Sequence, residues 1–326
     1  MSELLVVGAS ARAVDGLLGR LNVSGSSRRT LKRKQIQQVQ EPTVFGTPIR
    51  TIDLPKIGGG VVRWTGAAHP AAMLNHMAKT KAFSDILKDR MSKCKPTFRQ
   101  PWRLIYFADE ATSGNLLRRD PTKKAWCIYF TWVEMGTALM SMDISWIYGG
   151  IIHINKVKEV DGGFGTVFKH HMDYFFGQQC DLRNGITIHT ADSEVLMLFS
   201  TLGMVLADEL GTREIWGLKG SGSWRPCALC ANVVNARFGF EEHVTRDIVL
   251  HTETDPRKLK LHTDESVFAI IDKLRKASTS RCAELEKIHG FHHQRHGVLQ
   301  CLQLRSVVKP SCISYDFMHC FLTNGV

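Results

Sequence analysis

The spacing of hydrophobic and polar residues along this chain changes several times, and each change predicts a different kind of element. Between residues 66 and 94, apolar residues recur at helical spacing, with Pro70 near the start and Pro96 beyond the end. Proline is tolerated in the first turn of a helix and disrupts a helix interior. We therefore expect a helix or a pair of helices there, within a helical segment that covers residues 61–100.

From residue 101 onward the pattern becomes that of strands. The segments 104–107 and 126–132 are rich in aromatic and β-branched residues, and a polar Ser-Gly-Asn turn at residues 113–115 lies between them. This combination favours two neighbouring antiparallel strands. Further along, the pattern predicts an extended segment at 146–160, a helix at 168–176, a short strand at 185–190 and a long apolar run at 196–207. Three strands, a helix and another strand predict a mixed α/β sheet with acidic residues at strand ends.

Polar segments precede and follow this predicted sheet in the sequence. Residues 1–60 are expected to be mostly a disordered basic tail, because residues 22–60 show no apolar periodicity. The basic run within that tail suits a solvated linker, a nuclear-import signal or a segment that contacts phosphates. Its candidate nucleic-acid-binding residues are Arg28, Arg29, Lys32, Arg33 and Lys34. Residues 219–305 are expected to form a helical insertion, and residues 306–326 to begin a return to the sheet.

Composition and charge narrow the expected partners. The chain has 326 residues, of which 44% are hydrophobic, and this is enough for a substantial core. A formal net charge of +11 favours polyanions, with nucleic acid ahead of an anionic membrane surface. Nine cysteines with one close pair do not resemble a disulfide framework, and no secretory signal or apolar run of membrane-spanning length is present. We expect an intracellular protein without a membrane partner.

Two aspartates that follow apolar runs are candidate metal ligands. Asp109 ends the run that begins at Trp102, and Asp208 ends the run at 196–207. Carboxylates at the tips of neighbouring strands can hold two hard cations about 4 Å apart, an arrangement that supports phosphoryl transfer. Either aspartate alone is also explained as a turn or helix cap, so the hypothesis depends on the pair. Asp192 and Glu194 compete with Asp208, although no long apolar strand leads into them.

A close thiol pair follows the second aspartate. Cys227 and Cys230 are separated by two residues, which lets both reach one ion from a single turn and supplies half of a structural Zn²⁺ site. Buried free thiols and a redox dithiol are the alternatives, and the redox alternative requires a lowered thiol pKa. The remaining ligands must come from elsewhere, and the histidines at 292, 293 and 296 form the nearest cluster. Of these, His292 and His296 are the candidate zinc ligands.

The order of these motifs resembles that of a known family. Tyr106-Phe-Ala-Asp109-Glu-Ala-Thr-Ser-Gly-Asn115 is followed by Ala207-Asp208-Glu-Leu, then by Trp224-Arg-Pro-Cys-Ala-Leu-Cys230, and finally by Tyr315-Asp-Phe-Met-His319. Across residues 100–326 this order is similar to that of cut-and-paste DNA transposases with an RNase H-like catalytic domain. The similarity extends to the CACTA, Mirage and Chapaev type and, more distantly, to the catalytic subunit of the V(D)J recombinase.

The resemblance implies a fold, a chemistry and a location. It implies an RNase H-like core whose first part is 101–218, with a zinc-associated insertion at 219–305, in a nuclear DNA-binding protein that can form homo-oligomers. In that family three acids bind two Mg²⁺ ions for hydrolysis and strand transfer at transposon ends. Asp109 and Asp208 match the first two acids and Asp316 is a candidate third acid. His319, in the late Met-His motif, is a further candidate metal ligand.

The family pattern also raises an expectation about completeness. Its third acid and its late zinc-binding His pair would follow the Met-His motif, and this sequence continues for seven residues after His319. We therefore expect a C-terminally truncated, catalytically incomplete fragment of a transposable-element protein. The alternative function is a zinc-stabilised nucleic-acid-binding module without a catalytic role, in which the aspartates are caps and the basic tail provides affinity.

Overall fold

The structure of the protein is a computed structural model that describes residues 41–112, 124–235 and 252–315. The chain divides into two compact units. The first unit comprises Met1–Asp161 and His170–Leu206, and the second comprises Gly162–Lys169 and Ala207–Val326. The basic residues at 28–34 and the late candidates Asp316 and His319 lie outside the described residues, so their assignments stay predictions.

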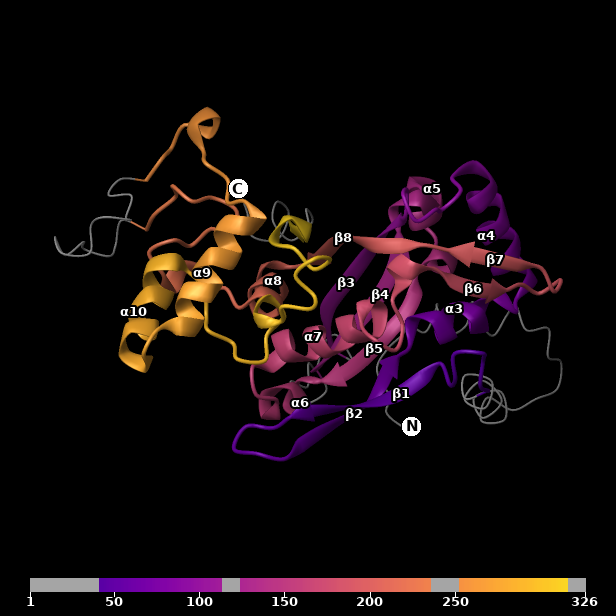
Figure 1. The fold of residues 1–326 in the computed structure, drawn as a ribbon, viewed down its shortest axis with the longest axis horizontal. Coiled ribbons are helices and arrows are strands. Elements are labelled where there is room, and N and C mark those ends of the chain that lie inside the picture. Colours follow the sequence, from indigo (N-terminus) through magenta and orange to yellow (C-terminus); the bar gives the residue numbers. More distant parts are fainter. Residues whose placement is uncertain (1–40, 113–123, 236–251, 316–326) are drawn as a thin grey trace. The chain divides into compact units, whose positions relative to one another are not determined.

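The first unit is built on a mixed β-sheet (Figure 1). Its strands are β1 (Ile49–Pro55), β2 (Val61–Ala68), β3 (Trp102–Thr112), β4 (Lys124–Trp132), β5 (Ile147–His153) and β8 (Ser200–Ala207). Within this unit the strands lie in the order β1-β2-β5-β4-β3-β8. Neighbours from β1 to β3 pair antiparallel, whereas β3 and β8 pair parallel. The predicted mixed α/β class is confirmed.

Buried indole groups join the central strands. The indole N–H of Trp132 donates to the Ser200 hydroxyl at 2.8 Å, and that hydroxyl donates to the carbonyl oxygen of Trp102 at 3.0 Å. Gly203 in β8 fits against β3 because it has no side chain, since an added Cβ would lie 2.7 Å from the Cβ of Arg103. The buried Trp132 indole N–H and Ser200 hydroxyl thus both have partners, and these bonds link β4, β3 and β8.

Helices and a second hairpin complete the first unit. The helices are α3 (Pro70–Ala78), α4 (Lys81–Lys93), α5 (Thr137–Met140), α6 (Ile154–Glu159) and the latter part of α7 (Gly163–Phe176). β6 (Ile186–His189) and β7 (Val195–Leu198) form a separate antiparallel pair. The Asn75 amide of α3 donates to the Thr187 carbonyl at 2.9 Å, and its Oδ1 accepts from the His189 backbone N–H at 3.0 Å. These bonds attach the hairpin to α3.

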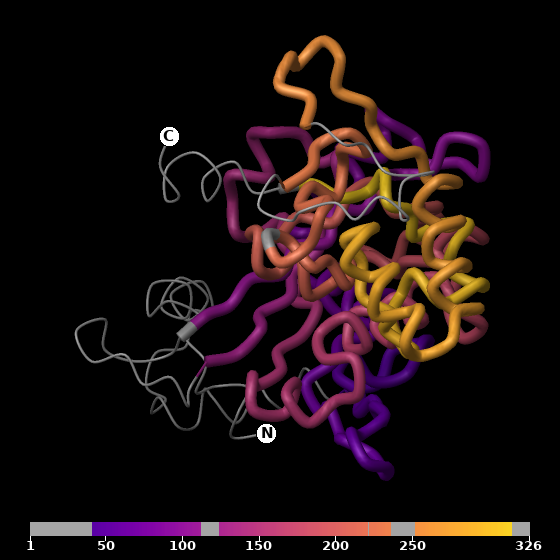
Figure 2. Tube along the Cα trace, turned by 90° about the vertical axis from the view of Figure 1, so that its left-hand side faces the viewer, coloured from indigo at the N-terminus to yellow at the C-terminus, as the bar shows by residue number. Residues whose placement is uncertain are grey.

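The second unit is mainly helical. Its helices are α8 (Glu209–Trp216), α9 (Asp264–Lys276) and α10 (Thr279–His289), and it also contains the short strand β9 (Ile313–Tyr315). α9 and α10 lie side by side (Figures 1 and 2). Arg305 forms two hydrogen bonds with the Asp272 carboxylate, at 3.0 and 2.7 Å, and its guanidinium lies 4.8 Å from the Phe268 ring centroid. This contact attaches the irregular C-terminal segment to α9.

The structure differs from the predicted segments at the N-terminal side. Residues 49–55 and 61–68 form the β1–β2 hairpin, where the sequence predicted part of a disordered tail and part of a helical segment. Buried and exposed residues alternate in both strands, which is the periodicity of a strand; the buried residues are Ile52, Leu54, Val62 and Trp64. The alternating stretch in each strand is short. The predicted division between a tail that ends at residue 60 and a helical segment that begins at residue 61 is therefore wrong, because it falls within this hairpin.

Later elements follow the predictions with smaller corrections. The helix pair at 66–94 is confirmed as α3 and α4, and the adjacent antiparallel strands as β3 and β4. The extended segment at 146–160 ends at His153, after which the chain forms α6. The apolar run at 196–207 is divided between β7 and β8. In the described part of 219–305 the regular helices are α9 and α10, with short 3-10 turns around them.

Across the described ranges, every helix is too short or too polar to cross a membrane.

Candidate functional site

Asp109 lies in β3 beside a cysteine of the neighbouring strand. It is half-buried and pairs directly with Cys127 of β4. Burial, together with the nearby charge of Asp109, raises the pKa of the Cys127 thiol to about 11. Cys127 is therefore protonated at neutral pH and is a poor nucleophile, because reactivity requires the thiolate. The group in this pair that suits a hard cation is the carboxylate.

Aromatic residues occupy the adjacent row on the same face of the sheet. Phe107 pairs with Tyr129 of β4, and Tyr129 pairs with Tyr148 of β5. Directly opposed residues project from the same face, so the three side chains form a row across three strands. The Phe107 and Trp146 rings meet at 6.0 Å with an interplanar angle of 65°. The Tyr148 hydroxyl donates to the Gly66 carbonyl at 3.0 Å, and burial raises its pKa. This row lies next to the Asp109–Cys127 pair on the same face of the sheet.

Glu110 points to the other face, as expected for the next residue of a strand. The Lys124 ammonium lies 3.1 Å from its Oε2. This ion pair gives Glu110 a local structural partner at the end of the β3–β4 pair.

Asp208 is the N-cap of α8. Its Oδ1 accepts a hydrogen bond from the Gly211 backbone N–H at 2.6 Å, and its backbone is extended. This is the capping role that the sequence had offered as the alternative to metal binding. In the first unit, Phe107 of β3 pairs with Leu206 of β8 in parallel register. Asp109 follows Phe107 by two residues, and Asp208 follows Leu206 by two residues, in the second unit.

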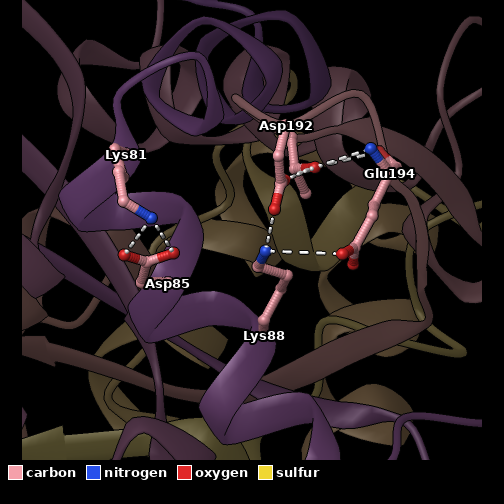
Figure 3. Close-up of polar contacts among 6 residues, drawn as sticks. Lys81, Asp85, Lys88, Asp192 and Glu194 are labelled. Carbon is pink, nitrogen blue, oxygen red and sulfur yellow. Dashed lines mark hydrogen bonds and ion pairs between the residues drawn. The ribbon is translucent and has the colours of Figure 1, made fainter.

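The competing acids Asp192 and Glu194 belong to a surface ion cluster (Figure 3). The Lys88 ammonium of α4 is hydrogen-bonded to Asp192 Oδ2 and lies 3.6 Å from Glu194 Oε1. Thr190 donates to Asp192 Oδ1 at 2.6 Å. The bonds from Lys88 and then from Thr190 lower the pKa of Asp192 to about 2. These acids attach the turn between β6 and β7 to α4, which gives both of them a structural role.

The predicted thiol pair lies together in the second unit. Burial, followed by the hydrogen bond with Cys227, raises the pKa of Cys230 to about 11. A raised pKa is opposite to what a redox dithiol requires. Leu261 forms a β-bridge with Cys230, and the His262 backbone N–H donates to the Leu229 carbonyl at 2.8 Å. Residues 260–262 therefore hold the Cys-Ala-Leu-Cys turn in place.

The histidines proposed to complete the zinc site are not grouped with the thiols. Among residues 41–112, 124–235 and 252–315, no set of three His, Cys, Asp or Glu side chains is arranged to hold an ion. The Lys219 ammonium lies 2.9 Å from Glu286 Oε2 and 3.4 Å from His292 Nδ1. Burial, and then the charge of Lys219, lowers the pKa of His292. Two cysteine thiols have the donor chemistry that suits Zn²⁺, and among the described residues no third His, Cys, Asp or Glu side chain is placed with them to hold an ion.

Sequence reasoning missed the partners that these residues acquire through folding. Lys88 is 104 residues from Asp192, and Lys219 is 67 residues from Glu286. Neither pairing has a local sequence signal, because a helix surface pairs residues only three or four apart.

No protein-family model matches this chain, and no curated protein matches it by sequence.

Proposed function

We propose that this chain is a DNA-binding protein derived from cut-and-paste transposases, with an RNase H-like core that binds divalent cations through Asp109 and Asp208. The observation that supports the proposal most is the parallel pairing of β3 with β8 after the antiparallel strands β3, β4 and β5. It accords with the predicted order of three strands, a helix and another strand, and with the core that the resemblance implies.

The register of the parallel pair supports the choice of acids. In a parallel pair the carboxyl ends of both strands lie at the same edge of the sheet. Phe107 pairs with Leu206, and each is followed two residues later by an aspartate. Each aspartate offers carboxylate oxygens, the donors that Mg²⁺ prefers. Asp316, the candidate third acid, stays a prediction.

The roles of the residues follow from this assignment. Mg²⁺ ions bound there would supply the Lewis acidity for phosphoryl transfer on DNA. Asp109 would supply one carboxylate from β3, beside the aromatic row that includes Phe107. Asp208 would present one carboxylate oxygen while the other, Oδ1, stays bonded to Gly211 N–H. That bond fixes the direction of the carboxylate.

The net charge supports the nucleic-acid part of the proposal. The chain carries 42 Lys and Arg against 31 Asp and Glu, a difference of +11. Neutralising phosphates releases counterions, so affinity for DNA should fall steeply as salt rises. Fluorescence anisotropy of a labelled duplex across a salt series measures this dependence. An affinity that is independent of salt would contradict DNA binding by the positive charge.

A second candidate function is a zinc-stabilised nucleic-acid-binding module without catalytic chemistry. It is favoured by the Asp208 cap, because Gly211 already gives that carboxylate a structural role. DNA nicking by the purified chain with Mg²⁺ or Mn²⁺ separates the two proposals. Cation-dependent nicking that is lost in both Asp109→Ala and Asp208→Ala supports the transposase-derived site. Robust cleavage that survives both substitutions would refute the assignment of these acids.

We also propose that Cys227 and Cys230 bind structural Zn²⁺. Metal analysis of the purified chain should give about one zinc per chain, and Cys227→Ser and Cys230→Ser should each lose it. Cys94→Ser, at an exposed cysteine outside the pair, is the matched control and should retain the metal. Equal zinc content in all variants would place the metal elsewhere.

A further inference from the structure

A turn between α4 and β3 presents an exposed aromatic side chain between two cations. Phe98 is 69% exposed, the highest value among the exposed large hydrophobic residues of the described chain. Lys95 and Arg99 beside it are also exposed. From residue 90 to residue 103 the sequence holds five basic residues and no acidic residue. The turn is therefore a strongly cationic site with an apolar tip.

The turn is held rigidly. The backbone N–H groups of Thr97 and Gln100 each donate to the other residue's carbonyl, at 3.0 and 3.2 Å. Gln100 N–H also lies 3.0 Å from the Thr97 hydroxyl. At the base of the loop, the Trp102 indole N–H donates to the Cys94 carbonyl at 2.7 Å. Phe98 is thus presented on a preorganised tip, so that little ordering cost opposes binding.

The cations of this segment divide into two groups. Arg103 is bonded to the Glu134 carboxylate at 3.0 Å, and Lys93 pairs with Asp89 at 2.8 Å. In the described parts of the chain, the side chains of Lys95 and Arg99 have neither a hydrogen-bond nor an ion-pair partner. The two cations nearest Phe98 are therefore those whose charge is not offset within the described protein.

We propose that the turn at residues 97–100 inserts Phe98 as an apolar wedge into duplex DNA, while Lys95 and Arg99 contact the flanking phosphates. Apolar side chains of proteins that bend DNA enter between base steps in this way, and flanking cations neutralise phosphates. A narrow two-residue tip fits between base steps better than a flat sheet face does. The polyanionic backbone of DNA complements the unbalanced charge of the turn.

This inference rests on the proposed DNA binding and adds a second contact to it. The turn precedes β3, whereas Asp109 lies near the far end of that strand. Asp109 is the seventh residue after Trp102, which corresponds to about 23 Å along a strand. The wedge therefore lies apart from the candidate cation site, and its removal should change binding and DNA bending without changing the cation ligands.

The test measures binding of the full chain to a fluorescein-labelled duplex of about 25 base pairs over a series of salt concentrations. Phe98→Ala should weaken binding by roughly tenfold, the scale of losing one aromatic contact with a base, and leave the salt dependence unchanged. Arg99→Ala and Lys95→Ala should each reduce the slope of log K against log salt by about 0.9. Arg63→Ala, which removes an exposed cation from β2, is the charge-matched control and should leave binding unchanged.

A second measurement detects the insertion of Phe98 between base pairs through the unstacking of the bases. A duplex with 2-aminopurine at successive positions should show a fluorescence increase at one step when the chain binds, because unstacking relieves quenching. Phe98→Leu should keep that increase, since leucine also acts as a wedge, and Phe98→Ala should lose it. If the chain binds the duplex but Phe98→Ala and Arg99→Ala behave like the unmodified protein, the wedge is refuted and DNA binding stands. If the unmodified chain fails to bind any duplex, both proposals are refuted.

Discussion

The phenol oxygen of Tyr106 lies 3.0 Å from Nδ1 of His171, and both side chains are fully buried in the first unit. The other ring nitrogen of His171, Nε2, lies 3.1 Å from the Ala68 carbonyl oxygen. A carbonyl only accepts hydrogen bonds, so Nε2 carries the proton and Nδ1 accepts from the tyrosine hydroxyl. This chain of bonds links β3, α7 and β2, and it requires His171 to be neutral.

Stability should therefore fall in mild acid. Burial lowers the pKa of His171 to about 4, and burial with the charge of Arg50 lowers that of His69 to about 4. Between pH 6.5 and 4 the unfolded chain binds protons at these residues and the folded chain does not, so stability decreases as the pH falls. Over this pH range, the shifted pKa of His171 should lower the free energy of unfolding by about 3 kcal/mol.

Urea unfolding at pH 7, 6, 5 and 4.5 measures this loss. His171→Gln should flatten the dependence, whereas His189→Gln, at an exposed histidine, should leave it unchanged. Equal pH dependence in the unmodified chain and in His171→Gln would contradict the assignment of the effect to His171.

Removing the tyrosine hydroxyl should destabilise the fold. In Tyr106→Phe the Nδ1 acceptor of His171 stays buried without its donor, which costs about 1–3 kcal/mol. The free energy of unfolding in urea at pH 7 is the readout. Tyr129→Phe is the matched control, because Tyr129 is only half-buried. Equal losses in the two variants would show that the hydrogen bond to His171 has no particular importance.

The ion cluster at Lys88 should hold the β6–β7 hairpin against α4 (Figure 3). Lys88→Met removes the ammonium that bridges Asp192 and Glu194, so the hairpin should open locally more often. Hydrogen exchange at residues 186–198 should become faster. The difference in exchange rate between Lys88→Met and the unmodified protein should become smaller at high salt, because salt screens the Lys88 ion pairs of the unmodified protein. Lys81 lies about two helical turns before Lys88 on α4 and pairs with Asp85. Lys81→Met should therefore leave exchange in the hairpin unchanged. Unchanged hydrogen exchange in the hairpin of Lys88→Met would contradict the proposed role of Lys88.

The sequence predicted those elements whose signal is local. Pro70 and helical spacing marked α3, and aromatic and β-branched residues marked β3 and β4. The β1–β2 hairpin was missed because Ile52 and Leu54 alternate with exposed polar residues over a short run, and three glycines at its tip resemble a linker. The tertiary pairing of these strands, which no local pattern encodes, gives the hairpin its stability.

The same limit applies to the candidate site. Asp109 and Asp208 were expected at strand ends, and the structure places Asp109 in β3 and Asp208 directly after β8. The capping of α8 by Asp208 was also foreseen as an alternative. The neutralisation of Asp192 by Lys88 could not be predicted, because it depends on how α4 packs against a distant hairpin.

The central claim is that Asp109 and Asp208 bind divalent cations, and calorimetric titration of Mn²⁺ into the full chain tests it most directly. We expect saturable binding that weakens at least about tenfold in Asp109→Asn and in Asp208→Asn, because each loses a charged oxygen ligand. Asp192→Asn, which alters the competing acid held by Lys88, should bind Mn²⁺ as the unmodified chain does. Equal affinity in all four proteins, or a loss confined to Asp192→Asn, would contradict the claim.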